Sequence, residues 1–458
     1  MIVTFSVSNF RSFSEEVTFS LVASSRAGND QKNHLVPIPN SDMSVLRAGV
    51  IYGANGSGKS NFCKALEYLR SLALDAQEKG SGTGREPFRF SKENCTDSCF
   101  DIQFISNDKL YRFGISVDDD KIIDEWLILI EGKREHVIYE RSTDKNGNVT
   151  VDGKGLKSAD KKLRALTHVG GIKEQSFLAT IRATLEQNSF NDSIRDVIQW
   201  FDTGITLVTP DSKFKPIGHV LSEDSDFLTF SSDFLHASST GIDRLNVIKR
   251  EIKDDEISIY LRSDDFLDKF VKSLPEDSRG VVEIGPTQEI SIDKKNGIKF
   301  SLINIESIHS HENGEDISMD LSEESDGTQR LLNLLPALHD MKQKNAVFVI
   351  DEVERSMHPL LIHKFMEYFL GGCCDGRSQM IVTTHESHLL DQELLRRDEV
   401  WFAEKDQRGA SKMYSLSDFQ PRRDLKIEKN YLEGRFGAIP FLAGIDSLRK
   451  RGDALNEL

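Results

Sequence analysis

The run from Gly53 to Ser60 has the residue spacing of a phosphate-binding loop. It reads Gly-Ala-Asn-Gly-Ser-Gly-Lys-Ser and matches the pattern G-x-x-x-x-G-K-[ST]. In such a loop the backbone amides and the next helix N-terminus face the phosphates, the lysine reaches the β- and γ-phosphates, and the final hydroxyl binds Mg²⁺. We therefore expect a nucleoside triphosphate site whose binding residues are Gly53, Asn55, Gly56, Ser57, Gly58, Lys59, Ser60 and Asn61.

Two carboxylates, Asp351 and Glu352, follow the apolar run from Val347 to Ile350. A buried strand with this ending delivers both acids to its carboxyl end. There the first acid can hold Mg²⁺, and the second can orient or deprotonate the attacking water. Adjacent acids also occur in surface turns, but the phosphate-binding loop in the same chain favours a role for Asp351 on the metal and for Glu352 in catalysis.

His385 ends a further apolar run, Met380 to Thr384, and a predicted helix over 358–370 separates this run from the two acids. A lone histidine is often structural. At the end of a strand in this order, however, a histidine stands where a sensor of the γ-phosphate belongs. The predicted catalytic residues are thus Lys59, Glu352 and His385, and the predicted metal ligands are Ser60 and Asp351.

The elements around these residues have the expected periodicity. Val50 to Tyr52 is an apolar run suited to a buried strand, and Phe62, Leu66, Leu69 and Leu72 fall on one face of the helix that follows the loop. A fourth motif, Ser325-Asp326-Gly327, precedes a predicted helix with leucines on one face. By itself this motif would be only the capped start of a helix.

The chain changes character twice, which predicts three regions. Residues 1–152 contain short β-type runs, and we expect an antiparallel sheet attached to the nucleotide-binding core. Residues 153–275 have mainly helical spacing, including 194–201 after the capping-box sequence Ser189 to Asp192, and are expected to form an inserted, mainly helical region. Residues 276–458 return to strands and then alternate helix and strand.

The net charge, the length of the apolar stretches and the cysteine content argue against several classes of protein. The net charge of −16 argues against a chain adapted to coat nucleic acid. No apolar stretch approaches the ~20 residues that span a bilayer, and no signal peptide is evident at the N-terminus. The five cysteines are odd in number and irregular in spacing, which indicates reduced thiols. We expect a cytoplasmic protein without membrane contact.

The order of the four motifs resembles the ATP-binding-cassette type of ATPase and, within it, the SMC, RecF and OLD branch. Asn9-Phe10-Arg11-Ser12-Phe13 is similar to the first strand of that branch, and the segment from Asp351 to Pro359 is similar to its Walker B motif and D-loop. Tyr431 to Pro440 most resembles the RloA/AbiL type of bacterial phage-defence ATPases, to which the PARIS ATPase subunit is more distantly similar. The resemblance covers both ends of the chain well and the middle poorly.

This resemblance implies an α/β fold, a P-loop ATPase head with an antiparallel β subdomain. It further implies that the chain binds and hydrolyses ATP with Mg²⁺, and that Arg11, Ser325 and Gly327 join the nucleotide-binding set. In the family the signature of one subunit completes the P-loop of another, so a homodimer or higher homo-oligomer is expected. The signature departs from the cassette pattern because Asp326 stands between Ser325 and Gly327.

The segment after His385, called the tail below, has 73 residues. Its acids Asp391, Glu393, Asp398 and Glu399 are interpreted as helix-surface charges rather than a nuclease centre. The resemblance therefore implies a separate effector, either a RloB-type protein or a toprim nuclease, in anti-phage defence. Two alternatives stay open: a RecF-like repair ATPase that binds DNA directly, and the cassette subunit of a membrane transporter.

Overall fold

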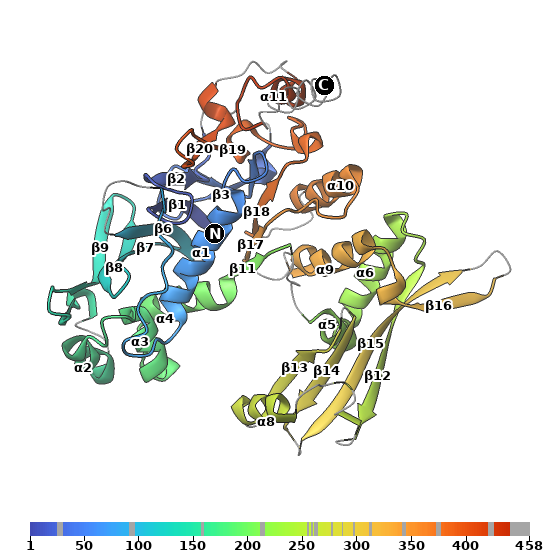
Figure 1. The fold of residues 1–458 in the computed structure, drawn as a ribbon, viewed down its shortest axis with the longest axis horizontal. Coiled ribbons are helices and arrows are strands. Elements are labelled where there is room, and N and C mark those ends of the chain that lie inside the picture. The colour runs from blue at the N-terminus through green and yellow to red at the C-terminus, as the bar shows by residue number, and fades with distance from the viewer. Residues whose placement is uncertain are drawn as a thin grey trace, which may run out of the picture.

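The computed structural model describes most of the chain. The described residues are 1–24, 31–90, 97–156, 160–210, 216–253, 256–257, 260, 264–275, 278–285, 287–295, 298–310, 314–340, 345–371, 377–419 and 426–439. Figure 1 shows two lobes, a larger one that contains β1 and α1 and a second one built by the elements from α5 to α9.

The larger lobe is built on a six-stranded sheet with the strand order β11-β17-β18-β5-β19-β20. All neighbours in it are parallel except β19 and β20. The strands are β5 (Ala48–Tyr52), β11 (Ile205–Val208), β17 (Val347–Ile350), β18 (Gln379–Thr384), β19 (Val400–Lys405) and β20 (Ser411–Ser415). Since β17, β18 and β5 are adjacent, the three segments that follow their carboxyl ends share one edge of the sheet.

A second, seven-stranded sheet is antiparallel, with the order β10-β9-β8-β7-β6-β1-β2. Its strands are β1 (Ile2–Ser8), β2 (Val17–Ser20), β6 (Ser98–Ser106), β7 (Lys109–Val117), β8 (Ile122–Glu131), β9 (Arg134–Thr143) and β10 (Val149–Asp152). In β1 and β6 buried residues alternate with half-buried ones, as antiparallel strands with one covered face require. A small hairpin of β3 (Leu35–Pro37) and β4 (Ser44–Leu46) precedes β5.

Helix α1 (Lys59–Leu74) packs between the two sheets. Its Phe62 ring contacts Phe5 and Phe19 of the antiparallel sheet at centroid distances of 5.5 and 5.0 Å. The opposite face of the parallel sheet is covered by α9 (Asp326–Asp340) and α10 (Pro359–Leu370), whose leucines and phenylalanines join one apolar cluster with Val50 and Phe348. The edge of the parallel sheet that follows β5, β17 and β18 is therefore held between two apolar layers.

Helices α2 (Lys161–Val169), α3 (Phe177–Thr184) and α4 (Asp192–Gln199) pack on the antiparallel sheet, and Trp200 after α4 stacks on Phe104 of β6. The predicted helix that begins near Asp192 is present, but its cap is Asn191, whose side chain accepts from the amide of Ile194 at 2.9 Å. Asn191 takes this place because it is the last residue with extended backbone before the helix.

The second lobe is a five-stranded antiparallel sheet with helices packed on it. Its order is β12-β15-β14-β13, and β16 also pairs with β15. Its elements are α5 (Ile217–Glu223), α6 (Ser225–Ala237), β12 (Arg244–Ile252), α8 (Asp264–Ser273), β13 (Arg279–Glu283), β14 (Gln288–Asp293), β15 (Lys299–Ser310), β16 (Asp316–Asp320) and α9. Asn296-Gly297, the sequence between β14 and β15, lies outside the described residues.

The structure divides the middle of the chain differently from the expected inserted region 153–275. Helices α2 to α4 stay on the larger lobe, and β11 then joins the parallel sheet beside β17. The chain enters the second lobe only afterwards. That lobe contains a sheet because the whole of β12, from Arg244 to Ile252, pairs with β15. Such long-range pairing stabilises strands whose local sequence carries no strong pattern.

No helix among the described residues combines the length and the apolar character that crossing a membrane demands. Of the cysteines, Cys63 and Cys99 lie in described segments and both are free thiols. The other three cysteines lie outside the described residues.

Candidate nucleotide-binding site

The loop between β5 and α1 has a backbone that only glycine fits at two of its positions. Gly58 has φ +112°, and a Cβ there would lie 2.2 Å from the hydroxyl of Ser411. A Cβ on Gly53 would lie 2.4 Å from the carbonyl oxygen of Ala403. The Ser411 hydroxyl also donates to the carbonyl of Ser57 at 2.7 Å, so β20 holds the loop directly. The loop is thus a fixed turn, as a phosphate cradle requires.

Lys59 is the first residue of α1 and is only 6% exposed. Its ammonium donates to the carbonyls of Gly53 at 2.6 Å and Ala54 at 3.2 Å. Burial lowers the pKa of this ammonium, and the negative charges of nearby carboxylates, with Glu354 acting most strongly, oppose the shift. A triphosphate would offer Lys59 a stronger charged partner than the two loop carbonyls.

The predicted residues Asn61 and Arg11 lie close to the loop in different ways. Asn61 donates to the hydroxyl of Ser12 at 2.8 Å, and this hydroxyl also hydrogen-bonds with the Ser411 hydroxyl at 2.8 Å. Arg11 has a positive φ of +49°, and its guanidinium pairs with Glu86. The segment Arg11-Ser12 therefore contacts the P-loop helix through Ser12, while the charge of Arg11 is already compensated.

Asp351 and Glu352 lie at the end of β17, beside the end of β18. The hydroxyl of Thr383 donates to a carboxylate oxygen of Asp351 at 2.5 Å and accepts from the amide of Glu352 at 2.9 Å. Glu352 has φ +50°, a strained conformation for a residue with a side chain. A pocket of about 370 Å³ brings Ser60, Asp351 and Glu352 together.

The donor set in this pocket fits Mg²⁺ bound together with a nucleotide. Ser60 offers a hydroxyl and Asp351 a carboxylate, both hard oxygen ligands, and Mg²⁺ is commonly held by one or two such ligands plus substrate phosphates. Over the described segments no group of three or more His, Cys, Asp or Glu residues could hold a metal by itself. The protein is therefore expected to supply few of the metal ligands, and the phosphates of the nucleotide would supply others.

Thr383 was not among the sequence-predicted residues, and its role can be tested. We expect Thr383→Val, which keeps the shape, to weaken apparent Mg²⁺ affinity in nucleotide binding about tenfold or more, because the partner that orients Asp351 is lost. Magnesium titrations of nucleotide binding measure this. The matched control is Thr384→Val in the same strand, since the Thr384 hydroxyl accepts from the Glu386 amide and, among the described residues, makes no hydrogen bond to Asp351. An equal loss in both variants would contradict a specific role for Thr383.

His385 follows β18, and its side chain is 59% exposed. Its Nδ1 lies 2.5 Å from an oxygen of Glu354, which also accepts from the His385 amide at 2.9 Å. Glu354 belongs to the loop that starts with Asp351 and Glu352. The structure thus brings the predicted histidine to the same sheet edge as both acids and Lys59.

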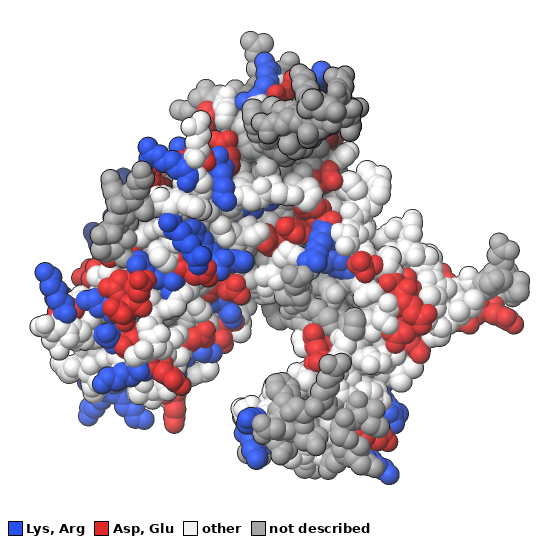
Figure 2. Space-filling view, in the orientation of Figure 1, with Lys and Arg blue, Asp and Glu red and all other residues white. Residues whose placement is uncertain are grey.

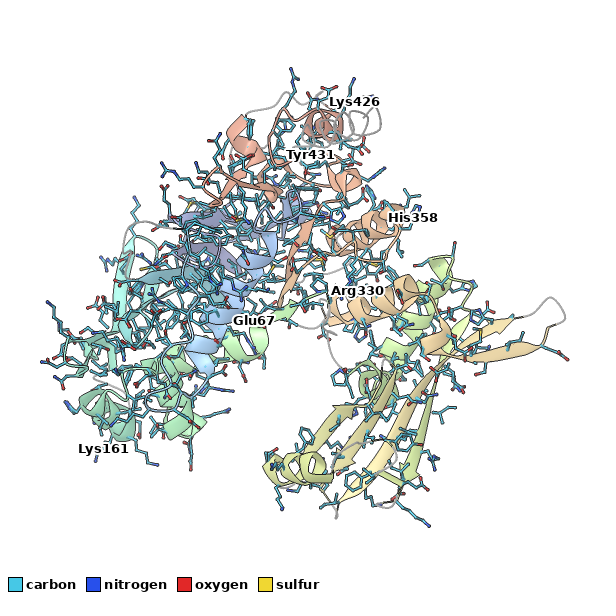
Figure 3. All side chains as sticks on the ribbon, viewed as in Figure 1. Glu67, Lys161, Arg330, His358, Lys426 and Tyr431 are labelled. Atoms are coloured by element: carbon cyan, nitrogen blue, oxygen red, sulfur yellow. The ribbon has the colours of Figure 1, made fainter. Side chains whose placement is uncertain are left out.

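Ser325 and Gly327 lie at the N-terminus of α9, outside the phosphate-binding loop. The Ser325 hydroxyl accepts from the amide of Thr328 at 3.2 Å and caps α9, and a Cβ on Gly327 would lie 2.5 Å from the carbonyl of Ser356. Both are therefore next to the loop that follows Glu352. Ser325 is exposed, and among the described residues no recorded hydrogen bond joins it to the P-loop of the same chain. In Figure 3 Arg330 of α9 lies at the junction of the two lobes, where it donates to the Thr209 carbonyl at 3.4 Å.

Two of the four tail acids are buried, contrary to the expectation that all four are surface charges. Asp398 and Glu399, interpreted as surface charges, are 5% and 0% exposed. Asp398 pairs with Arg396 at 2.8 Å, and Glu399 pairs with the buried His34 at 2.9 Å. Burial raises the pKa of the Glu399 carboxyl. The surface assignment is wrong because these acids hold the segment before β19 through buried ion pairs.

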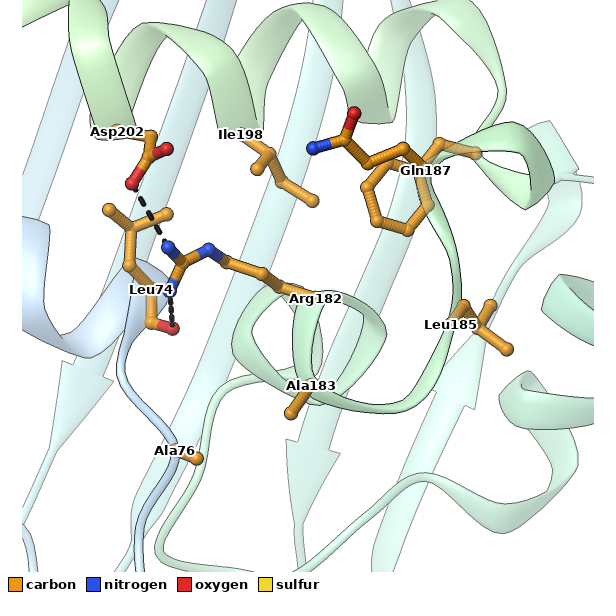
Figure 4. A pocket seen from close by; sticks show the side chains of 9 residues that line it. Leu74, Ala76, Arg182, Ala183, Leu185, Gln187, Ile198 and Asp202 are labelled. Atoms are coloured by element: carbon orange, nitrogen blue, oxygen red, sulfur yellow. Dashed lines mark hydrogen bonds and ion pairs between the residues drawn. The ribbon is translucent and has the colours of Figure 1, made fainter. Parts of the chain in front are cut away.

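Another pocket, of about 340 Å³, lies between the end of α1 and helices α3 and α4 (Figure 4). Arg182 crosses it, pairing with Asp202 at 3.0 Å and donating to the carbonyl of Leu74 at 3.1 Å. It contains none of the predicted nucleotide-binding residues.

Comparison with known proteins supplies the family. Residues 50–391, about three quarters of the chain, match the profile of the family described as "AAA domain, putative AbiEii toxin, Type IV TA system". The chain belongs to this AAA-domain family. The matched range begins in β5 and ends after His385, so it contains every predicted catalytic residue and metal ligand. No curated protein sequence matches the chain.

Solved structures similar to this AAA-domain protein include SMC heads. One is the SMC head bound to the C-terminal winged-helix domain of ScpA, at 15% identity over 92% of this chain and 99% of that chain, with a TM-score of 0.40. The SMC head domain from Thermotoga maritima matches at 13% identity over 90% and 98%, with a TM-score of 0.37. The SMC head with an extended coiled coil from Pyrococcus furiosus matches at 13% identity over 92% and 97%, with a TM-score of 0.36. The predicted α/β class, with a P-loop head and an antiparallel β subdomain, is confirmed by the topology described above.

Proposed function

We propose that this chain binds and hydrolyses ATP and acts as a nucleotide-dependent sensor or scaffold for a separate effector in anti-phage defence. The observation that carries the ATPase part is the shared sheet edge: the P-loop follows β5, Asp351 and Glu352 follow β17, and His385 follows β18. These strands are neighbours although the sequence separates them widely. A common location for a phosphate cradle, two acids and a histidine is what phosphoryl transfer to water requires.

The residues would divide the work as follows. Lys59 exchanges its loop carbonyls for the β- and γ-phosphates. Ser60 and Asp351 hold Mg²⁺, which neutralises charge on the phosphates when it is bound. Glu352 orients the attacking water or accepts its proton, and His385 contacts the γ-phosphate. The strained backbone of Glu352, held through Thr383, supports a preorganised position for that carboxylate.

The second part of the proposal is a composite site between two copies of the chain. Ser325 is exposed at the N-terminus of α9, a helix of 15 residues whose dipole favours an anion there. With no recorded bond from Ser325 to the P-loop of its own chain among the described residues, the motif is free to face the triphosphate of a second subunit. ATP would then hold the dimer together, and hydrolysis would remove that contact.

The proposed defence role rests on the family description and on the C-terminal part of the chain. The family description names a toxin of a type IV toxin–antitoxin system. The segment that begins at Tyr431 resembles the RloA type, and the structure describes it as far as residue 439. The tail acids Asp398 and Glu399 are engaged in buried ion pairs, which disfavours a nuclease centre built on them. The effector is therefore proposed to be a separate protein of the RloB or toprim type, in the cytoplasm.

Direct DNA binding is the alternative, and the charge distribution disfavours it. On the face seen in Figure 2, Lys and Arg side chains are interspersed with Asp and Glu and form no continuous basic band. Four basic residues lie close together near the C-terminus, Arg422, Arg423, Lys426 and Lys429, and the two arginines are outside the described residues. Duplex DNA binding that weakens steeply with salt would revive this alternative.

Three measurements on the purified chain test the proposed function. We expect ATP binding by calorimetry, Mg²⁺-dependent phosphate release, and a rise in mass by light scattering when ATP and Mg²⁺ are added. A chain that binds no ATP at millimolar concentration would refute the ATPase assignment. Metal-dependent cleavage of nucleic acid by the chain alone would refute the separate effector, and co-purification of a native partner would identify that effector.

A further inference from the structure

A single buried carboxylate contacts His385 at two points. One oxygen of Glu354 lies 2.5 Å from Nδ1 of the imidazole, and the same oxygen accepts from the His385 amide at 2.9 Å. The Glu354 side chain is 8% exposed, whereas the imidazole is 59% exposed. An exposed ring would otherwise sample several rotamers, so this contact fixes both the backbone and the ring of a residue at the surface of the site.

The chemistry of the pair also selects one nitrogen of the ring. When Nδ1 carries a proton and donates it to a carboxylate, Nε2 is the nitrogen left to contact a substrate. The same logic applies wherever an acid orients a catalytic histidine: the acid holds the tautomer and the ring position without touching the substrate.

We propose that Glu354 is a positioning residue that fixes the orientation and tautomer of His385 for contact with the γ-phosphate. The inference rests on the proposed function and adds to it a residue that neither the P-loop nor the two-acid motif supplies. Glu354 acts through His385 and is not itself a catalytic residue.

The loop that carries Glu354 does not depend on this carboxylate for its shape. The amide of Val353 donates to the Thr383 carbonyl at 3.1 Å, and the amide of Met357 donates to the Glu354 carbonyl at 2.9 Å. The second carboxylate oxygen of Glu354 is buried, and none of the described residues forms a hydrogen bond with it. Removing the carboxylate therefore removes the contact with His385 and leaves the backbone bonds of the loop in place.

A competing explanation is that Glu354 acts on Lys59, because its charge is the strongest of those that favour the charged form of that lysine. The two roles predict different kinetics. A role through Lys59 affects ATP affinity, because Lys59 binds phosphate before any bond breaks. A role through His385 affects turnover with ATP affinity unchanged, and its effect disappears when His385 is already absent.

The chain supplies a matched control pair three residues further on. Nδ1 of His388 lies 2.5 Å from Glu386, and the His388 ring is also 59% exposed. Glu386→Ala thus breaks a pair with the same Nδ1–oxygen distance and the same ring exposure, at a carboxylate that is more exposed than Glu354 and outside the proposed machinery. It should change the signal of His388 and leave the His385 signal and turnover unchanged.

The first test observes the pair without nucleotide. Protein labelled with ¹⁵N-histidine is compared by NMR as wild type, Glu354→Ala and Glu354→Gln, with His385→Asn assigning the signal. We expect Nδ1 of His385 to be protonated in the wild type and in Glu354→Gln, whose amide oxygen still accepts. In Glu354→Ala the ring should change to the Nε2–H tautomer that free imidazole prefers. An unchanged His385 signal in Glu354→Ala would overturn the proposal.

The second test measures turnover. Glu354→Ala should lower kcat roughly tenfold to a hundredfold, the usual cost of losing a partner that orients a histidine, with ATP affinity within twofold and Glu354→Gln close to wild type. Glu354→Ala combined with His385→Ala should be no slower than His385→Ala alone. Multiplying losses, or a weakened ATP affinity with normal kcat, would overturn it. If the wild type lacks ATPase activity, the proposed function fails while the NMR result still decides whether the pair forms.

Discussion

Replacing Lys59 by alanine is expected to abolish useful ATP binding. Removing one partner of a buried charged contact costs 2–5 kcal/mol, which corresponds to roughly a 30-fold to several-thousand-fold weaker affinity. The Lys59 ammonium is buried, and its hydrogen-bond partners among the described residues are two loop carbonyls. Calorimetric titration with ATP and Mg²⁺ measures the loss.

The same variant should not be less stable without nucleotide. Burial lowers the pKa of Lys59, so the folded state disfavours the charged form relative to the unfolded chain, and this cost persists at every pH below the folded-state pKa. Thermal unfolding of Lys59→Ala at neutral pH should occur at or above the wild-type temperature. Lys154→Ala, at a lysine that is 76% exposed and pairs with Asp152, is the control for lost charge. ATP affinity within threefold of wild type in Lys59→Ala would refute the predicted site.

Glu352→Gln should stop hydrolysis while ATP still binds. The amide keeps the shape of the carboxylate but cannot accept a proton from water, and the loss of a general base typically costs about 10²–10⁴ in rate. The backbone bond from Glu352 to Thr383 is unaffected by the change. Phosphate release in single-turnover experiments measures the effect.

With hydrolysis stopped, the ATP-bound dimer should accumulate and be visible by light scattering. Ser325→Arg in the Glu352→Gln background is expected to remove this species, since a large side chain would replace the exposed hydroxyl at the start of α9. A dimer that persists in the double variant, or a mass that never responds to ATP in Glu352→Gln protein that is monomeric without nucleotide, would argue against composite sites.

Local sequence patterns account for much of the candidate site. The P-loop, the two acids and His385 each follow an apolar run. These runs form β5, β17 and β18, which the structure places side by side. The glycines of the P-loop reflect local steric limits that a motif encodes well. Helix α4 also lies where helical spacing predicted a helix.

The remaining parts depend on contacts that no local pattern contains. β11 has four residues, Ile205–Val208, and becomes a strand only because it pairs with β17. Thr383 and Glu354 acquire their roles from residues more than 30 positions away. The buried acid Glu399 looked like a surface residue because its partner, His34, is remote in sequence.

The position of β11 has a mechanical consequence. The chain leaves the end of β11 for α5, and the last carbonyl of β11, that of Val208, accepts from the Asp351 amide at 2.8 Å. On the other side α9 leads directly into β17. One connection between the lobes therefore leaves β11, the direct neighbour of β17, and the other enters β17 itself. We expect a movement of the second lobe to act on these two strands and so to displace Asp351.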